Sequence, residues 1–139
     1  MKAEIKLAAS VDQDEDCIFD VVVRKANVET HVTFFGAVDT WQSFATQLLE
    51  FPSSAAATAV FNVEGGVYRD TLLLVAYCYD AAGHTALKVS TDNHAELPDR
   101  CTMEFSIRAE AASLNKLGQL LLGWQVKHDS EIVWEAQTS

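Results

Sequence analysis

Hydrophobic and polar residues alternate along several stretches of the chain, which is the pattern of strands with one buried face. Residues 28–35 show it most clearly, with Val28, Thr30, Val32 and Phe34 on one face and Glu29, His31 and Thr33 on the other. In the same way, residues 101–108 place Cys101, Met103, Phe105 and Ile107 inward. The pattern predicts strands at 3–9, 17–24, 28–35, 57–63, 70–79, 84–90 and 101–108. Residues 70–79 are apolar on both faces, which predicts a central strand covered on both sides.

Two stretches change to a helical period. Residues 39–50 gather an apolar stripe of Trp41, Phe44, Ala45, Leu48 and Leu49. We expect Asp39 or Thr40 to cap this helix, and Pro52 to stop it at Phe51. Residues 111–124 form a second stripe from Leu114 to Trp124, with Ser113 as the expected cap. Gly118 within it predicts a close approach to a sheet, and residues 125–139 are either a last strand or a loose tail.

The order of these elements is β-β-β-α-β-β-β-β-α, with few helical crossovers between strands. Such an order favours an α+β fold, because consecutive strands then pair with their neighbours. We expect one domain over residues 1–139, with a mainly antiparallel sheet of six to eight strands and both helices packed on one face.

The charge of the chain narrows the classes of partner. It carries 20 acidic and 10 basic residues, a formal net charge of -10, and the basic residues are scattered. Nucleic acids and anionic membranes are bound through clustered Lys and Arg, so we expect neither as a partner. A partner protein with a basic surface fits the charge. The acidity serves solubility alone in the alternative interpretation.

The three cysteines, Cys17, Cys78 and Cys101, lie in apolar runs and form no CxxC pair. We interpret all three as buried free thiols, which suits the reducing cytoplasm. The N-terminal residues are too polar for a signal peptide. No apolar stretch reaches the ~18 residues that span a membrane.

No catalytic or cofactor motif is visible. The run Asp12, Asp14, Glu15 and Asp16 resembles the start of a calcium loop, but Cys17 and Val23 stand where Gly and Glu are needed, so we expect a solvated turn. His31, His84, His94 and His128 are dispersed, without metal-ligand spacing. There is no GxSxG elbow and no glycine-rich phosphate loop. The sequence therefore predicts a non-catalytic protein without a cofactor or metal.

Three segments in order resemble a known group of proteins. They are the run from Phe44 to Pro52, the hairpin from Tyr79 to His84 that leads into Leu87 and Val89, and the run from Phe105 to Leu117. Over residues 28–122 they are similar to small bacterial proteins of the WapI-type immunity group and to neighbouring families of unknown function. The resemblance implies binding and neutralisation of a cognate toxin, with no catalysis and no cofactor, and it assigns no binding residues.

Three hypotheses follow. The first is a protein-binding domain, such as an immunity-like inhibitor, which contacts a basic partner through an acidic surface. Its contact residues are expected to be Asp12, Asp14, Glu15, Asp16, Glu29, His31, Asp92, Glu96 and Asp99. The second is a small enzyme or ligand-binding domain centred on His31 or His84 and a nearby carboxylate. The third is a structural protein that forms a homodimer by pairing sheet edges.

Overall fold

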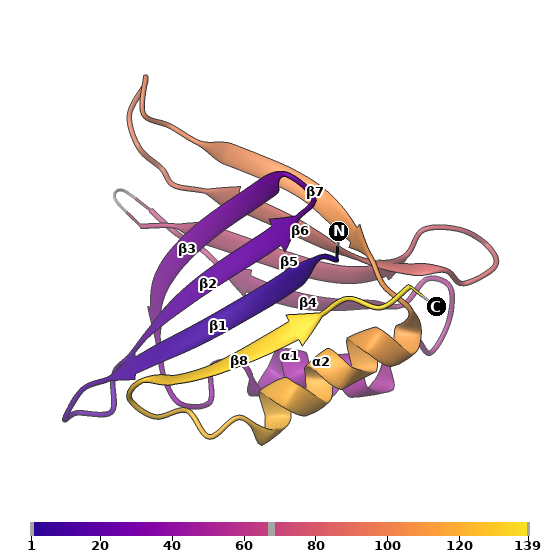
Figure 1. Ribbon diagram of the computed structural model, residues 1–139, viewed down its shortest axis with the longest axis horizontal. Coiled ribbons are helices and arrows are strands. Elements are labelled where there is room, and N and C mark those ends of the chain that lie inside the picture. The colour runs from indigo at the N-terminus through magenta and orange to yellow at the C-terminus, as the bar shows by residue number, and fades with distance from the viewer. Residues whose placement is uncertain (1, 67–68, 139) are drawn as a thin grey trace.

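A computed structural model describes residues 2–66 and 69–138. In chain order the elements are β1 (Glu4–Val11), β2 (Cys17–Lys25), β3 (Val28–Gly36), α1 (Gln42–Glu50), β4 (Thr58–Val63), β5 (Thr71–Cys78), β6 (Thr85–Asp92), β7 (Thr102–Arg108), α2 (Ala111–Gly123) and β8 (Ser130–Glu135). Figure 1 shows the strands as two stacked layers with both helices along one side. The predicted α+β class is confirmed, and the residues after 125 form a strand.

The eight strands divide into two antiparallel sheets of four, where the sequence suggested a single sheet. Sheet A has the order β3-β2-β1-β8, and sheet B has the order β4-β5-β6-β7. The segment with α1 carries the chain from β3 in sheet A to β4 in sheet B. Each sheet has one apolar face, and two such faces bury each other when they pack together.

The core lies between the sheets and is rich in aromatic side chains. Trp41, just before α1, stacks on Phe61 of β4 with ring centroids 4.0 Å apart. Phe19 of β2 and Phe34 of β3 pack against the same indole ring. This cluster joins sheet A, sheet B and the start of α1, so it fixes how the two layers sit on each other.

The two helices close one side of the sandwich. In Figure 1 they lie side by side next to the β8 and β4 edges, and α1 contacts β4 while α2 contacts β8. A Cβ atom at Gly118 of α2 would lie 2.9 Å from the carbonyl oxygen of Ala45 in α1. Gly118 therefore permits close contact with a helix, where the sequence suggested a sheet.

Both predicted helix caps are wrong. The residue before α1 is Trp41 and the residue before α2 is Glu110, and neither side chain caps its helix. Thr40 instead accepts a hydrogen bond from the backbone N–H of Ala37 at 2.7 Å. Ser113 lies buried inside the first turn of α2, where its hydroxyl accepts the N–H of Gln137 at 3.0 Å. The hydroxyl groups of Thr40 and Ser113 therefore bond backbone groups outside the helix ends that they were expected to cap.

Burial also differs from expectation in the strands. The interior strand β5 is covered on one face only, since Leu73, Val75 and Tyr77 on its other face are half-buried. Only Cys17 is buried; Cys78 is half-buried and Cys101 is exposed. Within residues 2–66 and 69–138, the outer face of β5 has no layer packed on it, and Cys101 lies outside β7, in the loop before it.

Candidate binding surface

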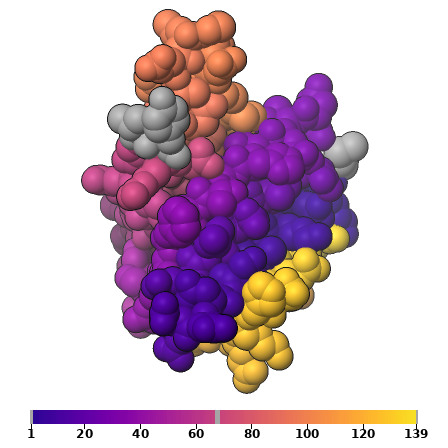
Figure 2. Space-filling model, turned by 90° about the vertical axis from the view of Figure 1, so that its left-hand side faces the viewer, coloured from indigo at the N-terminus to yellow at the C-terminus, as the bar shows by residue number. Residues whose placement is uncertain are grey.

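Four loops lie on one side of the molecule, the side that faces the viewer in Figure 2, and hold 10 of the chain's 20 acidic residues. We call residues 12–16, 64–66, 69–70, 92–101 and 127–129 the acidic end. Its ten acidic side chains are Asp12, Asp14, Glu15, Asp16, Glu64, Asp70, Asp92, Glu96, Asp99 and Asp129, against the basic Arg69, Arg100 and Lys127. In Figure 2 the 92–101 loop lies at the top of this face and the 12–16 turn at the bottom, with β2 and β3 between them. The resulting field attracts cationic partners.

Three hollows lie in a row along β3 and share walls with one another. The first, of about 570 Å³, lies between the 12–16 turn and Phe35. The second, of about 280 Å³, shares Phe35 and reaches Asp70. The third, of about 160 Å³, shares Asp70 and extends to Asp92 at the end of β6. The second and third hollows therefore flank β3 from Glu29 to Phe35, and the first crosses the outer face of sheet A from β3 to β1.

Phe35 is the apolar centre of this row. Its ring is 70% exposed although it lies in a regular strand. It pairs across the sheet with Ile18, which is also exposed, and both line the first hollow. Asp12 and Asp16 form the rim of the same hollow. An exposed aromatic side chain at the centre of a charged rim resembles the anchor of a protein interface.

The turn that carries this acidic rim is held by its own first residue. One carboxylate oxygen of Asp12 accepts the backbone N–H of Asp14 at 2.9 Å and that of Asp16 at 3.0 Å. The predicted turn is confirmed. The pKa of the Cys17 thiol beside it is raised by burial and then by the negative charge of Asp12, so this thiol stays protonated at neutral pH.

Asp70 joins the two sheets at the second hollow. Its carboxylate accepts the backbone N–H of Thr33 in β3 at 2.9 Å. At the third hollow, the hydroxyl groups of Thr30 in β3 and Thr91 in β6 lie 3.2 Å apart. On this side of the molecule, single polar side chains connect the two sheets. On the opposite side, the two helices connect them.

Glu29 and His31 form the outer wall of the third hollow. One Glu29 oxygen lies 2.7 Å from Nε2 of His31, and the other accepts the Nε–H of Arg24 at 2.6 Å. The hydrogen bond from His31 and then that from Arg24 lower the pKa of Glu29. Glu29 therefore stays ionised under weakly acidic conditions.

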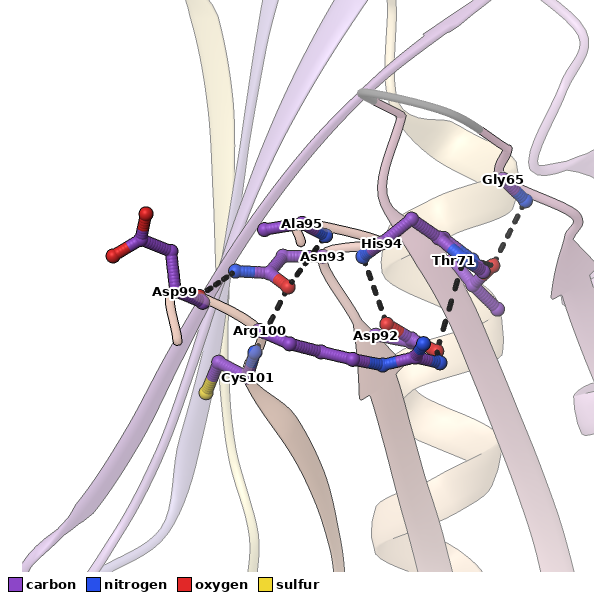
Figure 3. A network of polar contacts seen from close by, with 9 residues as sticks. All are labelled: Gly65, Thr71, Asp92, Asn93, His94, Ala95, Asp99, Arg100 and Cys101. Carbon is purple, nitrogen blue, oxygen red and sulfur yellow. Dashed lines mark hydrogen bonds and ion pairs between the residues drawn. The ribbon is translucent and has the colours of Figure 1, made fainter. Parts of the chain in front are cut away.

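The 92–101 loop is held in shape by a network of polar contacts (Figure 3). Asp92 accepts the backbone N–H of His94 at 2.8 Å and an Arg100 N–H at 2.7 Å, and these bonds lower its pKa. Asn93 accepts the N–H groups of Ala95 and Cys101 and donates to the carbonyl of Asp99. The loop backbone is thereby fixed from both ends.

The tip of this loop presents an apolar side chain. Leu97 is 85% exposed, between the carboxylates of Glu96 and Asp99. His94 lies 2.6 Å from the hydroxyl of Thr71, which accepts the N–H of Gly65, so the loop is tied to the β4–β5 hairpin. An exposed leucine on a preorganised loop can enter a partner's pocket without a large loss of conformational entropy.

The residues predicted from sequence are only partly brought together. Glu29, His31 and Asp92 share the third hollow. Asp12 and Asp16 line the first hollow, and Asp14 and Glu15 lie in the same turn. Glu96 and Asp99 lie at the tip of the 92–101 loop. Sequence reasoning missed Phe35, Asp70 and Leu97. An aromatic residue at an outward position of the alternating pattern was the available signal for Phe35.

His84 lies apart from this row. Its Nδ1–H donates to Asp80 at 2.6 Å, its ring stacks on Tyr79, and it lines a hollow of about 260 Å³ together with Arg108. The hydrogen bond from His84 lowers the pKa of Asp80. Trp41, Phe44, Trp124 and Trp134 are buried in the core, whereas Tyr79 beside His84 is 43% exposed.

Within the described residues, no group of three or more His, Cys, Asp and Glu side chains is arranged to hold a metal ion. No described helix has the length and apolar character needed to cross a membrane. No known family model, curated protein or solved structure matches the chain. The resemblance to the WapI-type immunity group therefore stays a prediction.

Proposed function

We propose that this chain is a non-catalytic protein-binding domain that recognises a basic partner protein through the acidic end. The observation that carries the proposal is the exposed Phe35 between hollows that are lined by carboxylates of the 12–16 turn, the β4–β5 hairpin, β3 and the end of β6. Interfaces combine such an apolar anchor with a polar rim.

The charge of the acidic end argues for the kind of partner. Its formal charge of -7 is most of the chain's -10, although its loops are a minority of the residues. A second copy of the chain would be repelled there, whereas a basic surface would be attracted over about one Debye length. A cationic partner is therefore favoured over self-association at this surface.

The test compares two surface variants with the wild type. Tagged wild-type protein, Phe35→Ser and Val133→Ser are used to capture partners from an extract of the source organism. Val133 is the matched control because it is also an exposed apolar residue of sheet A, on β8 and outside the hollows. We expect a basic protein to bind the wild type and Val133→Ser, and to lose at least about 10-fold in affinity for Phe35→Ser.

The affinity of the captured protein is then measured by calorimetry at low and high salt. We expect weaker binding at higher ionic strength, because exposed charges are screened. A partner with an acidic surface, or one that binds Phe35→Ser as well as the wild type, would contradict the proposal.

The narrower proposal is an immunity-like inhibitor of a toxin, which the resemblance implies. If the captured protein arrests growth when expressed alone, co-expression of this chain should restore growth, and co-expression of Phe35→Ser should not. A captured protein that is harmless alone counts against this narrower role and leaves the binding function intact.

A second candidate function is the binding of a small ligand at the hollow beside His84. The ring there is oriented by Asp80, and Arg108 lies 5.7 Å from the Tyr79 ring centre. The ring proton signals of His84 are followed by NMR while small carboxylates and phosphates are added. Saturable shifts at millimolar concentrations or below would support this candidate, and unchanged signals would count against it.

A further inference from the structure

We infer that the partner segment bound at the acidic end is an extended basic strand, which adds to the free edge of β3. This inference rests on the proposed function and deepens it, because it specifies how the partner is held. β3 is the outermost strand of sheet A, so one of its edges has no neighbour among the strands that the structure describes.

The register of the β2–β3 hairpin determines which backbone groups of β3 are free. The turn has two residues, Ala26 and Asn27, so Lys25 and Val28 form the hydrogen-bonded pair next to it. Bonded and non-bonded pairs then alternate, and Thr30, Val32 and Phe34 exchange hydrogen bonds with β2. The N–H and C=O groups of Glu29, His31, Thr33 and Phe35 consequently point away from β2, to the free edge.

One contact in the structure shows that this edge accepts a hydrogen-bonding partner. The N–H of Thr33 donates to the carboxylate of Asp70 at 2.9 Å, as it would to the carbonyl of an added strand. In the described residues, no side chain or non-sheet backbone group bonds to the backbone of Glu29, His31 or Phe35. Asp70 protects the centre of the edge, and the positions on both sides of it are open.

The surroundings of the edge match an extended segment. The second and third hollows follow β3 from Glu29 to Phe35, which is the direction that an added strand would take. In strand addition, backbone hydrogen bonds supply affinity and side-chain pockets supply specificity. Carboxylates of Asp70, Asp92 and Glu64 lie along the row, so we infer lysine or arginine at alternate positions of the segment, with apolar residues between them.

The probe for the test is a nine-residue peptide of alternating Lys and Val. Its binding is compared with that of a Glu/Val peptide and with that of the same Lys/Val peptide carrying N-methyl groups on alternate backbone nitrogens. The methylated peptide keeps its charge and its side chains but cannot complete the ladder. We expect the Lys/Val peptide to bind, the methylated one to bind at least 10-fold more weakly, and the Glu/Val peptide to show no binding. The backbone amide protons of Glu29 and His31 should become protected from exchange.

Two variants at Asp70 separate hydrogen bonding from charge. Asp70→Asn and Asp70→Ala both remove the negative charge, but only alanine frees the N–H of Thr33. We expect Asp70→Ala to bind the Lys/Val peptide about 3- to 10-fold more tightly than Asp70→Asn does, which is the effect of one hydrogen bond. Equal affinities of the two variants would contradict strand addition.

The remaining outcomes distinguish this inference from the proposed function. Equal binding of the methylated and unmethylated peptides, or a captured basic protein that needs Phe35 but leaves the β3 amides unprotected, overturns strand addition and leaves the protein-binding function standing. A dimer in solution with protected β3 amides would make a second copy the occupant and would overturn the inference as well. Loss of both peptide binding and Phe35-dependent capture overturns both.

Discussion

The two sides on which sheets A and B meet are built in opposite ways. On the closed side, α1 and α2 pack against each other and against β4 and β8, and Trp134 of β8 is 1% exposed. On the open side, β3 lies beside the ends of β5 and β6, and the polar links include Thr30 to Thr91, Asp70 to Thr33, and Lys25 to the carbonyl of Ser106. The first side buries apolar surface, which stabilises the fold. The second leaves hollows, charges and free backbone groups, which a binding surface needs.

Because of this difference, we expect substitutions on the closed side to affect stability and substitutions on the open side to affect binding. Contacts on the closed side are buried and close-packed, so changes there leave cavities or clashes. On the open side, the hydrogen bond from Thr33 to Asp70 is exposed to water, which can replace it when it is lost. We therefore expect substitutions on the closed side to reduce stability more than substitutions on the open side.

We expect the largest loss of stability from a substitution at the contact between α1 and α2. Gly118→Val places a branched side chain where a Cβ alone would lie 2.9 Å from both the Ala45 oxygen and the Leu48 Cβ. We expect the free energy of unfolding to fall by about 3 kcal/mol, through overpacking. Urea denaturation measures it. Gly123→Ala is the control, since a Cβ there meets nothing within 4 Å; a similar loss in both variants would contradict the crossing as the cause.

The next prediction compares two side chains that bond the backbone of a neighbouring element, one on each side. Asn115 of α2 donates to the carbonyls of Leu48 and Phe51 at the end of α1. We expect Asn115→Ala to cost about 2 kcal/mol in thermal or urea unfolding, because two hydrogen bonds between the helices are lost and the Phe51 carbonyl loses the Asn115 donor. Asp70→Ala should cost less than about 0.5 kcal/mol, because its contact is exposed. An equal loss of unfolding free energy in Asn115→Ala and Asp70→Ala would contradict the distinction between the closed and the open side.

The third prediction concerns two buried tryptophans. The Nε1–H of Trp134 donates to the carbonyl of Ser113 at 2.8 Å, whereas the Nε1–H of Trp41 is buried without a hydrogen-bond partner in the described part of the chain. Trp→Phe removes similar volume at both positions but a hydrogen bond only at Trp134. We expect Trp134→Phe to lose about 1 kcal/mol more in urea unfolding than Trp41→Phe. A larger loss of unfolding free energy in Trp41→Phe than in Trp134→Phe would show that packing outweighs the hydrogen bond.

The smallest effect is a pH dependence of the open side. The lowered pKa values of Glu29 and Asp92 mean that their contribution to stability is present above their unfolded values of 4.5 and 3.8 and is lost as pH falls through the folded values. We expect the double variant Glu29→Gln/Asp92→Asn to lose less stability between pH 6 and 3 than the wild type. Linkage predicts that its unfolding takes up fewer protons, by at most about two. Parallel pH profiles in urea unfolding would contradict this assignment.

Much of the fold could be predicted because its strands and helices are amphipathic over a few residues. The alternation at 28–35 and the stripe from Phe44 to Leu48 depend on local spacing, and both elements form as expected. Residues whose partners are distant in sequence were missed. Asp70 meets Thr33, and Trp134 packs in the core, although the sequence left residues 125–139 as either a last strand or a loose tail. Neither contact leaves a local pattern in the sequence.

The α+β class, the element order, the acidity and the outward face of Glu29 and His31 follow from composition or short-range periodicity, so they could be predicted. The division into two sheets, the closure of one side by helices, and the position of acidic loops on one side of the molecule appear only in the folded chain. These features depend on which apolar faces pack together. That choice is made by long-range contacts, and it leaves the edge of β3 free beside Phe35.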